Sequence, residues 1–214
     1  MNLEQIFDRL WNDYTAQNPS ASKIFNLLSG RGETILNDHI AFRTFNDPSM
    51  GIEVLAKPFL DQGYQPAGQY QFKQKHLSAI HFELPGKEDA PRVFISELLL
   101  ENFSPFLLET ILTSIEQVDT TLWKSKDLIF AGPIFDIPSY ETYEKLRVES
   151  EYAAWLYVHG FRANHFTVSV NSLKGFGGIE EVNGLLKEKG FLLNSSGGEV
   201  KGSREQLLKQ SSTM

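Results

Sequence analysis

Residues 162–170 are Arg162-Ala163-Asn164-His165-Phe166-Thr167-Val168-Ser169-Val170. Apolar and polar side chains alternate here: one side carries Phe166, Val168 and Val170, and the other carries His165, Thr167 and Ser169. A period of two predicts a half-buried β-strand. The apolar side can pack under helices, and the polar side presents an imidazole and two hydroxyl groups.

An earlier stretch has the same design. Residues 37–45 are Asn37-Asp38-His39-Ile40-Ala41-Phe42-Arg43-Thr44-Phe45, in which Ile40, Phe42 and Thr44 alternate with His39, Ala41 and Arg43. Each stretch is followed by an amphipathic run that ends in a glycine and an aromatic residue, Gly63-Tyr64 and Gly190-Phe191. The spacing from histidine to glycine is 24 residues in the first copy and 25 in the second. The sequence therefore predicts an internal duplication of a strand-helix-strand unit.

Composition limits the classes of protein that fit. The chain has 214 residues, of which 41% are hydrophobic and 22% charged, as in an ordinary globular protein. Its net charge of -7 argues against a nucleic-acid surface, which needs clustered Lys and Arg. No apolar run approaches the roughly 18 residues that span a bilayer, and the N-terminus has no signal-peptide pattern. The absence of cysteine excludes disulfides and thiolate sites, and it fits a cytoplasmic protein.

We expect an α+β fold in a single compact domain. Its parts are N-terminal helices (1–30), a first βαβββ unit (31–100), a helical insertion (101–160) and a second unit (161–214). Helices are expected at 2–17, 21–29, 49–62, 104–118, 121–127, 139–159 and 178–189, and strands at 38–45, 64–72, 77–84, 92–99, 164–171, 191–195 and 206–213. The offset of 127 residues between Gly63 and Gly190 would place the counterpart of Glu97 near position 224. Either the second unit lacks its last strand or the natural chain is longer, and we expect a longer chain, because an unpaired sheet edge is costly.

His39 and His165 occupy equivalent places in the two copies. A lone histidine on a strand is more often structural, but a pseudo-twofold relation would bring these two side chains into one cavity, which favours metal binding by both. Two imidazoles and one carboxylate, with open positions opposite, form the ligand set of non-haem Fe(II) oxygenases. Glu97 is the candidate carboxylate. The alternatives for Glu97 are an exposed residue at the end of its strand or a hydrogen-bond acceptor for an imidazole N–H.

Other polar side chains have two readings each. Arg43 lies on the side of its strand that carries the first histidine, ~13 Å along the strand, and can make a forked contact with a substrate carboxylate. A salt bridge to an acidic residue is an equal alternative for Arg43. His81 and Glu83 share a face of a later strand, so either they line the cavity or His81 is a structural hydrogen-bonding residue, and we expect the second. His76 and His159 are expected to face solvent.

Four runs resemble the 2-oxoadipate dioxygenase/decarboxylase family, a member of the vicinal-oxygen-chelate superfamily. The runs are Asn37-Asp38-His39-Ile40-Ala41-Phe42-Arg43-Thr44, Val93-Phe94-Ile95-Ser96-Glu97-Leu98, the segment from Ala153-Ala154-Trp155 through Asn164-His165-Phe166-Thr167, and Gln210-Ser211-Ser212-Thr213. The resemblance covers the chain from about residue 30 to its end. It implies paired βαβββ units that form a curved mixed sheet around a metal cavity.

The resemblance also implies an activity. Members of the family use Fe(II) and dioxygen to decarboxylate and hydroxylate 2-oxoadipate, which gives 2-hydroxyglutarate and CO2 in lysine catabolism. His39 and His165 would be metal ligands, and Arg43 would contact a carboxylate of the small 2-oxo acid. Zn, Ni or Mn are alternatives to iron. The third ligand of the family is a glutamate late in the second unit, and no match to it occurs before Met214.

Two other functions stay open at this stage. The first is another metal-dependent chemistry of the same superfamily, an isomerase or a hydrolase. The second is a metal-free module that binds a ligand without transforming it. The sequence does not fix the oligomeric state.

Overall fold

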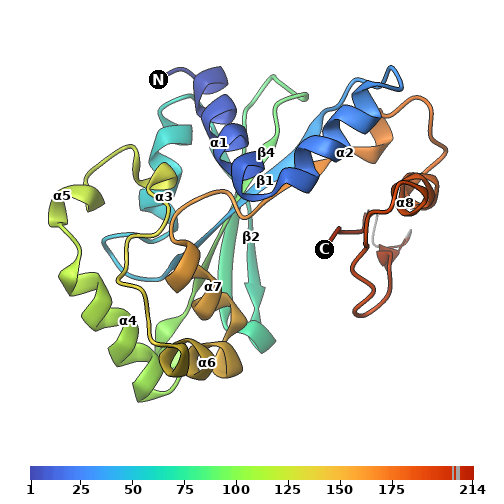
Figure 1. Ribbon diagram of the computed structural model, residues 1–214. Coiled ribbons are helices and arrows are strands. Elements are labelled where there is room, and N and C mark those ends of the chain that lie inside the picture. The colour runs from blue at the N-terminus through green and yellow to red at the C-terminus, as the bar shows by residue number, and fades with distance from the viewer. Residues whose placement is uncertain (204, 206–207) are drawn as a thin grey trace. The chain divides into compact units, whose positions relative to one another are not determined.

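The computed structural model in Figure 1 describes residues 1–203, 205 and 208–214. Two compact units make up the chain: Met1–Tyr14 with Asp38–Thr167, and Thr15–Asn37 with Val168–Met214. Each unit has its own core of buried apolar side chains. This division differs from the single compact body that we expected. The helical insertion contributes to the core of the first unit, whereas Leu28 packs with Leu173 and Leu186 in the core of the second.

The regular elements follow the predicted order closely in the first unit. The helices are α1 (Leu3–Gln17), α2 (Pro19–Ser29), α3 (Ile52–Leu60), α4 (Pro105–Gln117), α5 (Thr120–Trp123), α6 (Tyr140–Glu149), α7 (Glu151–His159) and α8 (Ile179–Glu188). The strands are β1 (Asn37–Phe45), β2 (Gln65–Phe72), β3 (Leu77–Glu83), β4 (Arg92–Leu98), β5 (His165–Val168), β6 (Lys201–Ser203) and β7 (Leu208–Gln210). Short 3-10 turns occur at Lys73–Lys75, Leu100–Asn102, Leu128–Phe130 and Val170–Ser172. No helix in these described ranges is both long and apolar enough for a membrane crossing.

The central sheet has the strand order β2-β3-β4-β1-β5. β1 runs parallel to β4, whereas β3 is antiparallel to both β2 and β4. β1, α3, β2, β3 and β4 thus form the predicted βαβββ unit. β5 lies beside β1, and the N–H of Asn164 donates to the carbonyl oxygen of Ala41 at 2.9 Å. The two histidine strands are therefore neighbours.

The two faces of the sheet have different roles. On the core face, Ile40 pairs in register with Val93 and Phe42 with Ile95, and all four side chains are buried. α3 covers this face, where the ring of Phe59 lies 5.6 Å from that of Phe42. The opposite face carries the alternate side chains of β1 and β4, among them His39, Ala41, Arg43, Arg92, Phe94 and Ser96. We call it the histidine face, and the predicted alternation of β1 is confirmed.

Residues 139–159 form two helices, although we predicted one long helix. The break is at Ser150, whose backbone is extended (φ -153°, ψ 105°). Its hydroxyl accepts a hydrogen bond from the N–H of Ala153 at 3.1 Å and so caps α7. A serine side chain can replace the hydrogen bonds of a continuous helix with its own bonds to the backbone. The capping hydrogen bond of Ser150 therefore interrupts the helix, although the apolar pattern continues across it.

The second copy of the duplication is incomplete in the described residues. β5 is shorter than the predicted strand 164–171, because the chain turns into a 3-10 helix at Val170–Ser172. In the predicted strand 191–195, pairing is limited to an isolated bridge between Leu193 and Thr213, flanked by backbone hydrogen bonds of 2.8 Å from Asn194 to Ser212 and 3.0 Å from Met214 to Leu192. The predicted strand 206–213 is reduced to β7, which pairs with β6, and residues 206 and 207 lie outside the described part.

Candidate metal site

His39 and His165 meet on the histidine face. The Nε2 atoms of the two rings are 3.1 Å apart, and the ring planes are nearly perpendicular at 81°. Two nitrogens that each form a bond of about 2.1 Å to one ion can lie this close together. His39 and His165 would therefore be the residues that hold a shared metal ion.

The surroundings of His39 leave its Nε2 free. The Oδ2 of Asp38 lies 2.8 Å from Nδ1 of His39, and because a carboxylate only accepts, Nδ1 carries the proton. This hydrogen bond, with the nearby charge of Arg92, holds the pKa of Asp38 below its ordinary value. The hydroxyl of Thr167 accepts from the N–H of His39 at 2.9 Å and donates to its carbonyl at 2.7 Å. Thr167 thus fixes the backbone that carries the ring.

His165 is uncharged at neutral pH. Burial, together with interaction with His39 and Arg43, lowers the pKa of His165 to about 4. The neutral imidazole is the form that binds metal. Asn164 places its Nδ2 3.1 Å from Nδ1 of His165, and its Oδ1 is buried without a hydrogen-bond partner. The reverse orientation of this amide would present Oδ1 to Nδ1–H and free Nε2 for a metal.

Glu97 does not lie beside the two histidines. It pairs in register with Thr44, on the core face, whereas His39 lies on the opposite face. Its Oε2 accepts from the N–H of Ile52 at 3.2 Å, at the start of α3, where the N-cap Gly51 offers no side chain. Burial raises the pKa of Glu97. The placement counts against our expectation of Glu97 as third ligand: alternation along β4 puts it with the buried residues.

No third ligand completes the pair within residues 1–203, 205 and 208–214: no group of three His, Cys, Asp or Glu side chains there could hold a metal ion. The described site therefore offers two protein ligands. With the Asn164 amide in the reverse orientation, both Nε2 atoms would carry free lone pairs and would fit two ligand positions of an Fe(II)-type centre.

Arg43 lies on the histidine face between two aromatic rings. Its guanidinium carbon is 4.9 Å from the ring centre of Tyr152 and 4.8 Å from that of Trp155. Burial lowers its pKa. The predicted alternative, a salt bridge to an acidic residue, is not formed with any carboxylate of the described residues. Arg92, in contrast to Arg43, forms salt bridges with two carboxylates, those of Asp38 and Glu83.

Tyr152 ties α7 to the sheet, a role that the sequence did not reveal. Its hydroxyl donates to the carbonyl oxygen of Ser96 at 2.6 Å and accepts from the N–H of Thr44 at 3.0 Å. Burial raises its pKa, so the hydroxyl stays protonated. The sequence showed Tyr152 only as an apolar position of a helix. Its hydrogen bonds hold the ring against Arg43.

The remaining histidines agree with their predicted roles. His81 is a hydrogen-bonding residue, with its Nδ1 2.9 Å from the Tyr70 hydroxyl and its Nε2 3.3 Å from a carboxylate oxygen of Glu83. His76 and His159 are exposed.

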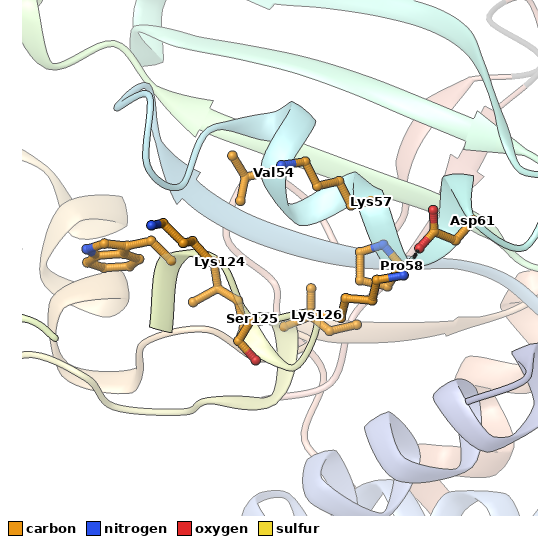
Figure 2. Close-up of a pocket in the computed structure, with 10 residues that line it drawn as sticks. Val54, Lys57, Pro58, Asp61, Lys124, Ser125 and Lys126 are labelled. Atoms are coloured by element: carbon orange, nitrogen blue, oxygen red, sulfur yellow. Dashed lines mark hydrogen bonds and ion pairs between the residues drawn. The ribbon is translucent and has the colours of Figure 1, made fainter. Parts of the chain in front are cut away.

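A separate pocket of about 180 Å³ lies between α3 and the segment 123–129 (Figure 2). Lys57, Lys124 and Lys126 line it, and the Nζ of Lys126 is 2.6 Å from a carboxylate oxygen of Asp61. None of the predicted site residues borders this pocket. Exposed lysines alone do not define a binding site, so the histidine face remains the candidate functional site.

One family model matches almost the whole chain. The model of the 2-oxoadipate dioxygenase/decarboxylase family matches residues 5–131 and 133–214. The chain belongs to this family. A curated relative from Oryza sativa subsp. japonica, the chloroplastic/amyloplastic 2-oxoadipate dioxygenase/decarboxylase, is 37% identical over 230 residues, which cover 100% of this chain and 60% of the relative. The chain thus spans about 60% of the length of the curated relatives it matches.

Two solved structures confirm the α+β fold. A protein of Shewanella frigidimarina NCIMB 400, provisionally described as a hydrolase, superposes with a TM-score of 0.94 at 52% identity, over 100% of this chain and 83% of that one. The hydroxyglutarate synthase of Oryza sativa, solved in complex with 2-oxoadipate, superposes with a TM-score of 0.88 at 36% identity, over 98% of this chain and 71% of that one. The resemblance found in the sequence is confirmed.

Proposed function

We propose that this chain acts as an Fe(II)-dependent dioxygenase/decarboxylase on a 2-oxo dicarboxylic acid, namely 2-oxoadipate in lysine catabolism. The bond between the keto carbon and the adjacent carboxyl carbon breaks, and the products are 2-hydroxyglutarate and CO2. The atoms of 2-oxoadipate and one dioxygen molecule account for both products. The observation that carries the proposal is the 3.1 Å separation of the Nε2 atoms of His39 and His165, in a chain that belongs to this family.

His39 and His165 would hold the metal through their Nε2 atoms. A bound Fe(II) supplies an open, charged site at which dioxygen and a 2-oxo acid can react. Zn, Ni or Mn would fit the same two nitrogens, so the identity of the metal is part of the proposal. The low pKa of His165 keeps its ring available to a metal in neutral and mildly acidic solution.

Arg43 supports the choice of an anionic substrate. Its charge is near enough to the metal pair to contribute to the lowered pKa of His165. The rings of Tyr152 and Trp155 cover its guanidinium and leave the charge without a carboxylate partner among the described residues. A charged hydrogen bond in such a partly dry site is stronger than one in water. We assign Arg43 the role of binding a substrate carboxylate.

Oxygen uptake tests the proposal. The protein is loaded with Fe(II) without oxygen, its iron content is measured, and dioxygen consumption is followed with and without 2-oxoadipate. We expect uptake that depends on 2-oxoadipate and yields equal amounts of 2-hydroxyglutarate and CO2. His39→Ala and His165→Ala should each abolish the uptake, whereas Arg9→Gln, in an exposed ion pair with Asp127, should not change it.

Two results would reject the proposal in different ways. An iron-loaded sample that consumes no dioxygen rules out the oxygenase. Turnover of the substrate without dioxygen would instead favour a hydrolase, the provisional description of the Shewanella relative. Unchanged ligand affinity in both histidine variants would favour the metal-free binding module.

We propose separately that the chain is located in the cytoplasm. The composition without cysteine fits the cytoplasm. The plant relatives are named as chloroplast proteins. Fractionation of the source cells, followed by detection of this chain, would decide between the cytoplasm and another compartment.

A further inference from the structure

A line of polar contacts crosses the sheet and ends at His39. The Nε of Arg92 on β4 donates to Oε1 of Glu83 on β3 at 2.8 Å. The Nη1 of Arg92 donates to Oδ1 of Asp38 on β1 at 3.3 Å, and Oδ2 of Asp38 accepts from Nδ1 of His39 at 2.8 Å. The parallel register places Arg92 directly opposite His39. Three adjacent strands thus contribute to the surroundings of one imidazole.

The direction of each hydrogen bond in this line is fixed by chemistry. A guanidinium only donates and an ionised carboxylate only accepts. Asp38 therefore receives hydrogen bonds from both sides, and the proton of a neutral His39 must be on Nδ1. The other ring is not constrained in this way, since the amide of Asn164 can present either nitrogen or oxygen to Nδ1 of His165.

We propose that Asp38, held in place by Arg92, is a positioning residue that presets the tautomer and orientation of His39 for metal binding. The metal in this statement rests on the proposed function. Arg92 prevents the half-exposed carboxylate of Asp38 from turning into water, and Glu83 anchors Arg92 on the other side. Outer partners of this kind orient metal-binding histidines and typically change metal affinity by about 10- to 100-fold.

A purely structural role predicts a different result. Exposed ion pairs contribute little to stability, so the loss of Arg92 would then change nothing near His39. The chain offers a matched control in the pair of Arg9 and Asp127, which is 2.9 Å long. Its side chains are 47% and 59% exposed, against 51% and 43% for Arg92 and Asp38. Arg9→Gln therefore removes a comparable ion pair that does not touch a histidine.

The experiment reads the tautomer of His39 directly. Imidazole 15N shifts of the metal-free full chain are measured by NMR at about pH 8, where an ordinary imidazole is neutral. The His39 signal is identified by its loss in His39→Gln, and Co(II) affinity is then measured by titration. We expect Nδ1–H in the wild type, and a shift toward Nε2–H with about 10-fold weaker Co(II) binding in Asp38→Asn. Arg92→Gln should change the His39 tautomer and the Co(II) affinity in the same direction as Asp38→Asn, but by a smaller amount. Arg9→Gln should change neither the tautomer nor the affinity.

Several outcomes would overturn the proposal. One is an unchanged His39 tautomer in Asp38→Asn. Another is a loss of Co(II) affinity that is equal in Arg92→Gln and Arg9→Gln. Asp38→Glu keeps an acceptor and should retain the Nδ1–H form, so the test stands even if Asp38→Asn does not fold. If the wild-type chain bound no Co(II), the result would contradict the proposed metal-dependent function. The comparison of His39 tautomers would still decide whether Asp38 positions the ring.

Discussion

His39 and Arg43 lie on the same side of β1, four residues apart, in very different surroundings. His39 faces a carboxylate at Nδ1 and the second imidazole at Nε2. Arg43 faces two aromatic rings and no carboxylate of the described residues. Under the proposed function, a metal held by the two histidines would bind one end of a dianionic substrate and Arg43 would bind the other. Recognition of a carboxylate by Arg43 is the part of this arrangement that a single substitution tests.

Arg43→Gln should raise the KM for 2-oxoadipate by about 10- to 100-fold, since a hydrogen bond to a charged group contributes about 1.5–3 kcal/mol. Metal affinity should stay within about 3-fold of the wild type, because Arg43 is not a ligand. Steady-state oxygen uptake and a metal titration measure the two quantities. Arg147→Gln, which removes an exposed pair with Glu144, serves as the control. An unchanged KM in Arg43→Gln would show that the substrate carboxylate binds elsewhere.

Some of these residues could be predicted from the sequence and others could not. The alternation of β1 and of the stretch around His165 was sufficient to place both imidazoles and Arg43 on one face. The same alternation placed Glu97 with Val93 and Ile95, and these two apolar partners already indicated a buried face. The contact of Arg92 with Asp38 depends on the register of β4 against β1, which no local pattern encodes.

At the scale of elements, the connection between α7 and β5 positions His165. Gly160 ends α7 with a φ of +65°, and a Cβ atom there would lie 1.8 Å from the carbonyl oxygen of Gly132. The backbones of Gly132 and Phe161 exchange two hydrogen bonds, of 2.8 and 2.9 Å. The chain enters β5 from this close contact, so the glycine at position 160 is required by both conformation and space.

Gly160→Ala should destabilise the first unit by more than about 3 kcal/mol, because backbone strain and a steric clash add together. Gly86→Ala is the control: Gly86 also has a positive φ, +76°, but nothing lies within 4 Å of its added Cβ. Its cost should stay near about 1 kcal/mol. Urea denaturation of both variants measures the difference. Equal losses in the two variants would contradict the close contact at Gly160.

Glu97 should act on α3 and not on the metal. Its folded pKa is raised, so the folded state binds protons more readily, and the stability that Glu97 contributes is largest at low pH and is lost as pH rises through that pKa. Glu97→Gln removes this effect, so the variant should gain stability relative to the wild type as the pH rises above the ordinary carboxyl pKa of 4.5. At pH 7 the two should differ by less than about 1 kcal/mol. A loss of metal affinity in Glu97→Gln would contradict the placement of Glu97 on the core face.

The elements of the first unit were predictable because each has a clear local period. The apolar pattern of residues 139–159 continues across Ser150 and therefore predicted one helix. The helix is interrupted by the capping hydrogen bond of Ser150 with Ala153, which only the structure shows. The second unit was predicted less well. The predicted strand 191–195 forms one isolated bridge, between Leu193 and Thr213. The periodicity of a segment does not determine whether it pairs with another segment in a sheet.

At the scale of the whole molecule, the candidate site and the larger hydrophobic core belong to the same one of the two units. Both histidines, Arg43 and the line from Glu83 to Asp38 belong to the first unit. The core of that unit includes side chains from α1, α3, α4 and α7. Unfolding of the first unit should therefore report on the ionisation of the site. The buried, neutral His165 is the group with the largest expected effect.

The metal-free protein should lose stability as pH falls from about 6.5 to about 4. The folded pKa of His165 lies near 4, below its ordinary value of 6.5, so the unfolded state binds more protons in this interval. The contribution of His165 to this loss is about 3 kcal/mol. Chemical denaturation at several pH values should show a shallower loss in His165→Gln and an unchanged loss in the control His76→Gln, which alters an exposed residue. A wild-type profile identical to that of His165→Gln would contradict the buried, neutral state.

The central claim is that one metal ion joins the two halves of the duplication through His39 and His165. The most direct test is a crystal structure of the iron-loaded full chain with anomalous scattering recorded at the iron edge. The account predicts a single anomalous peak within about 2.2 Å of both Nε2 atoms. A peak bound elsewhere, with the two Nε2 atoms still 3.1 Å apart and in contact only with each other, would contradict it.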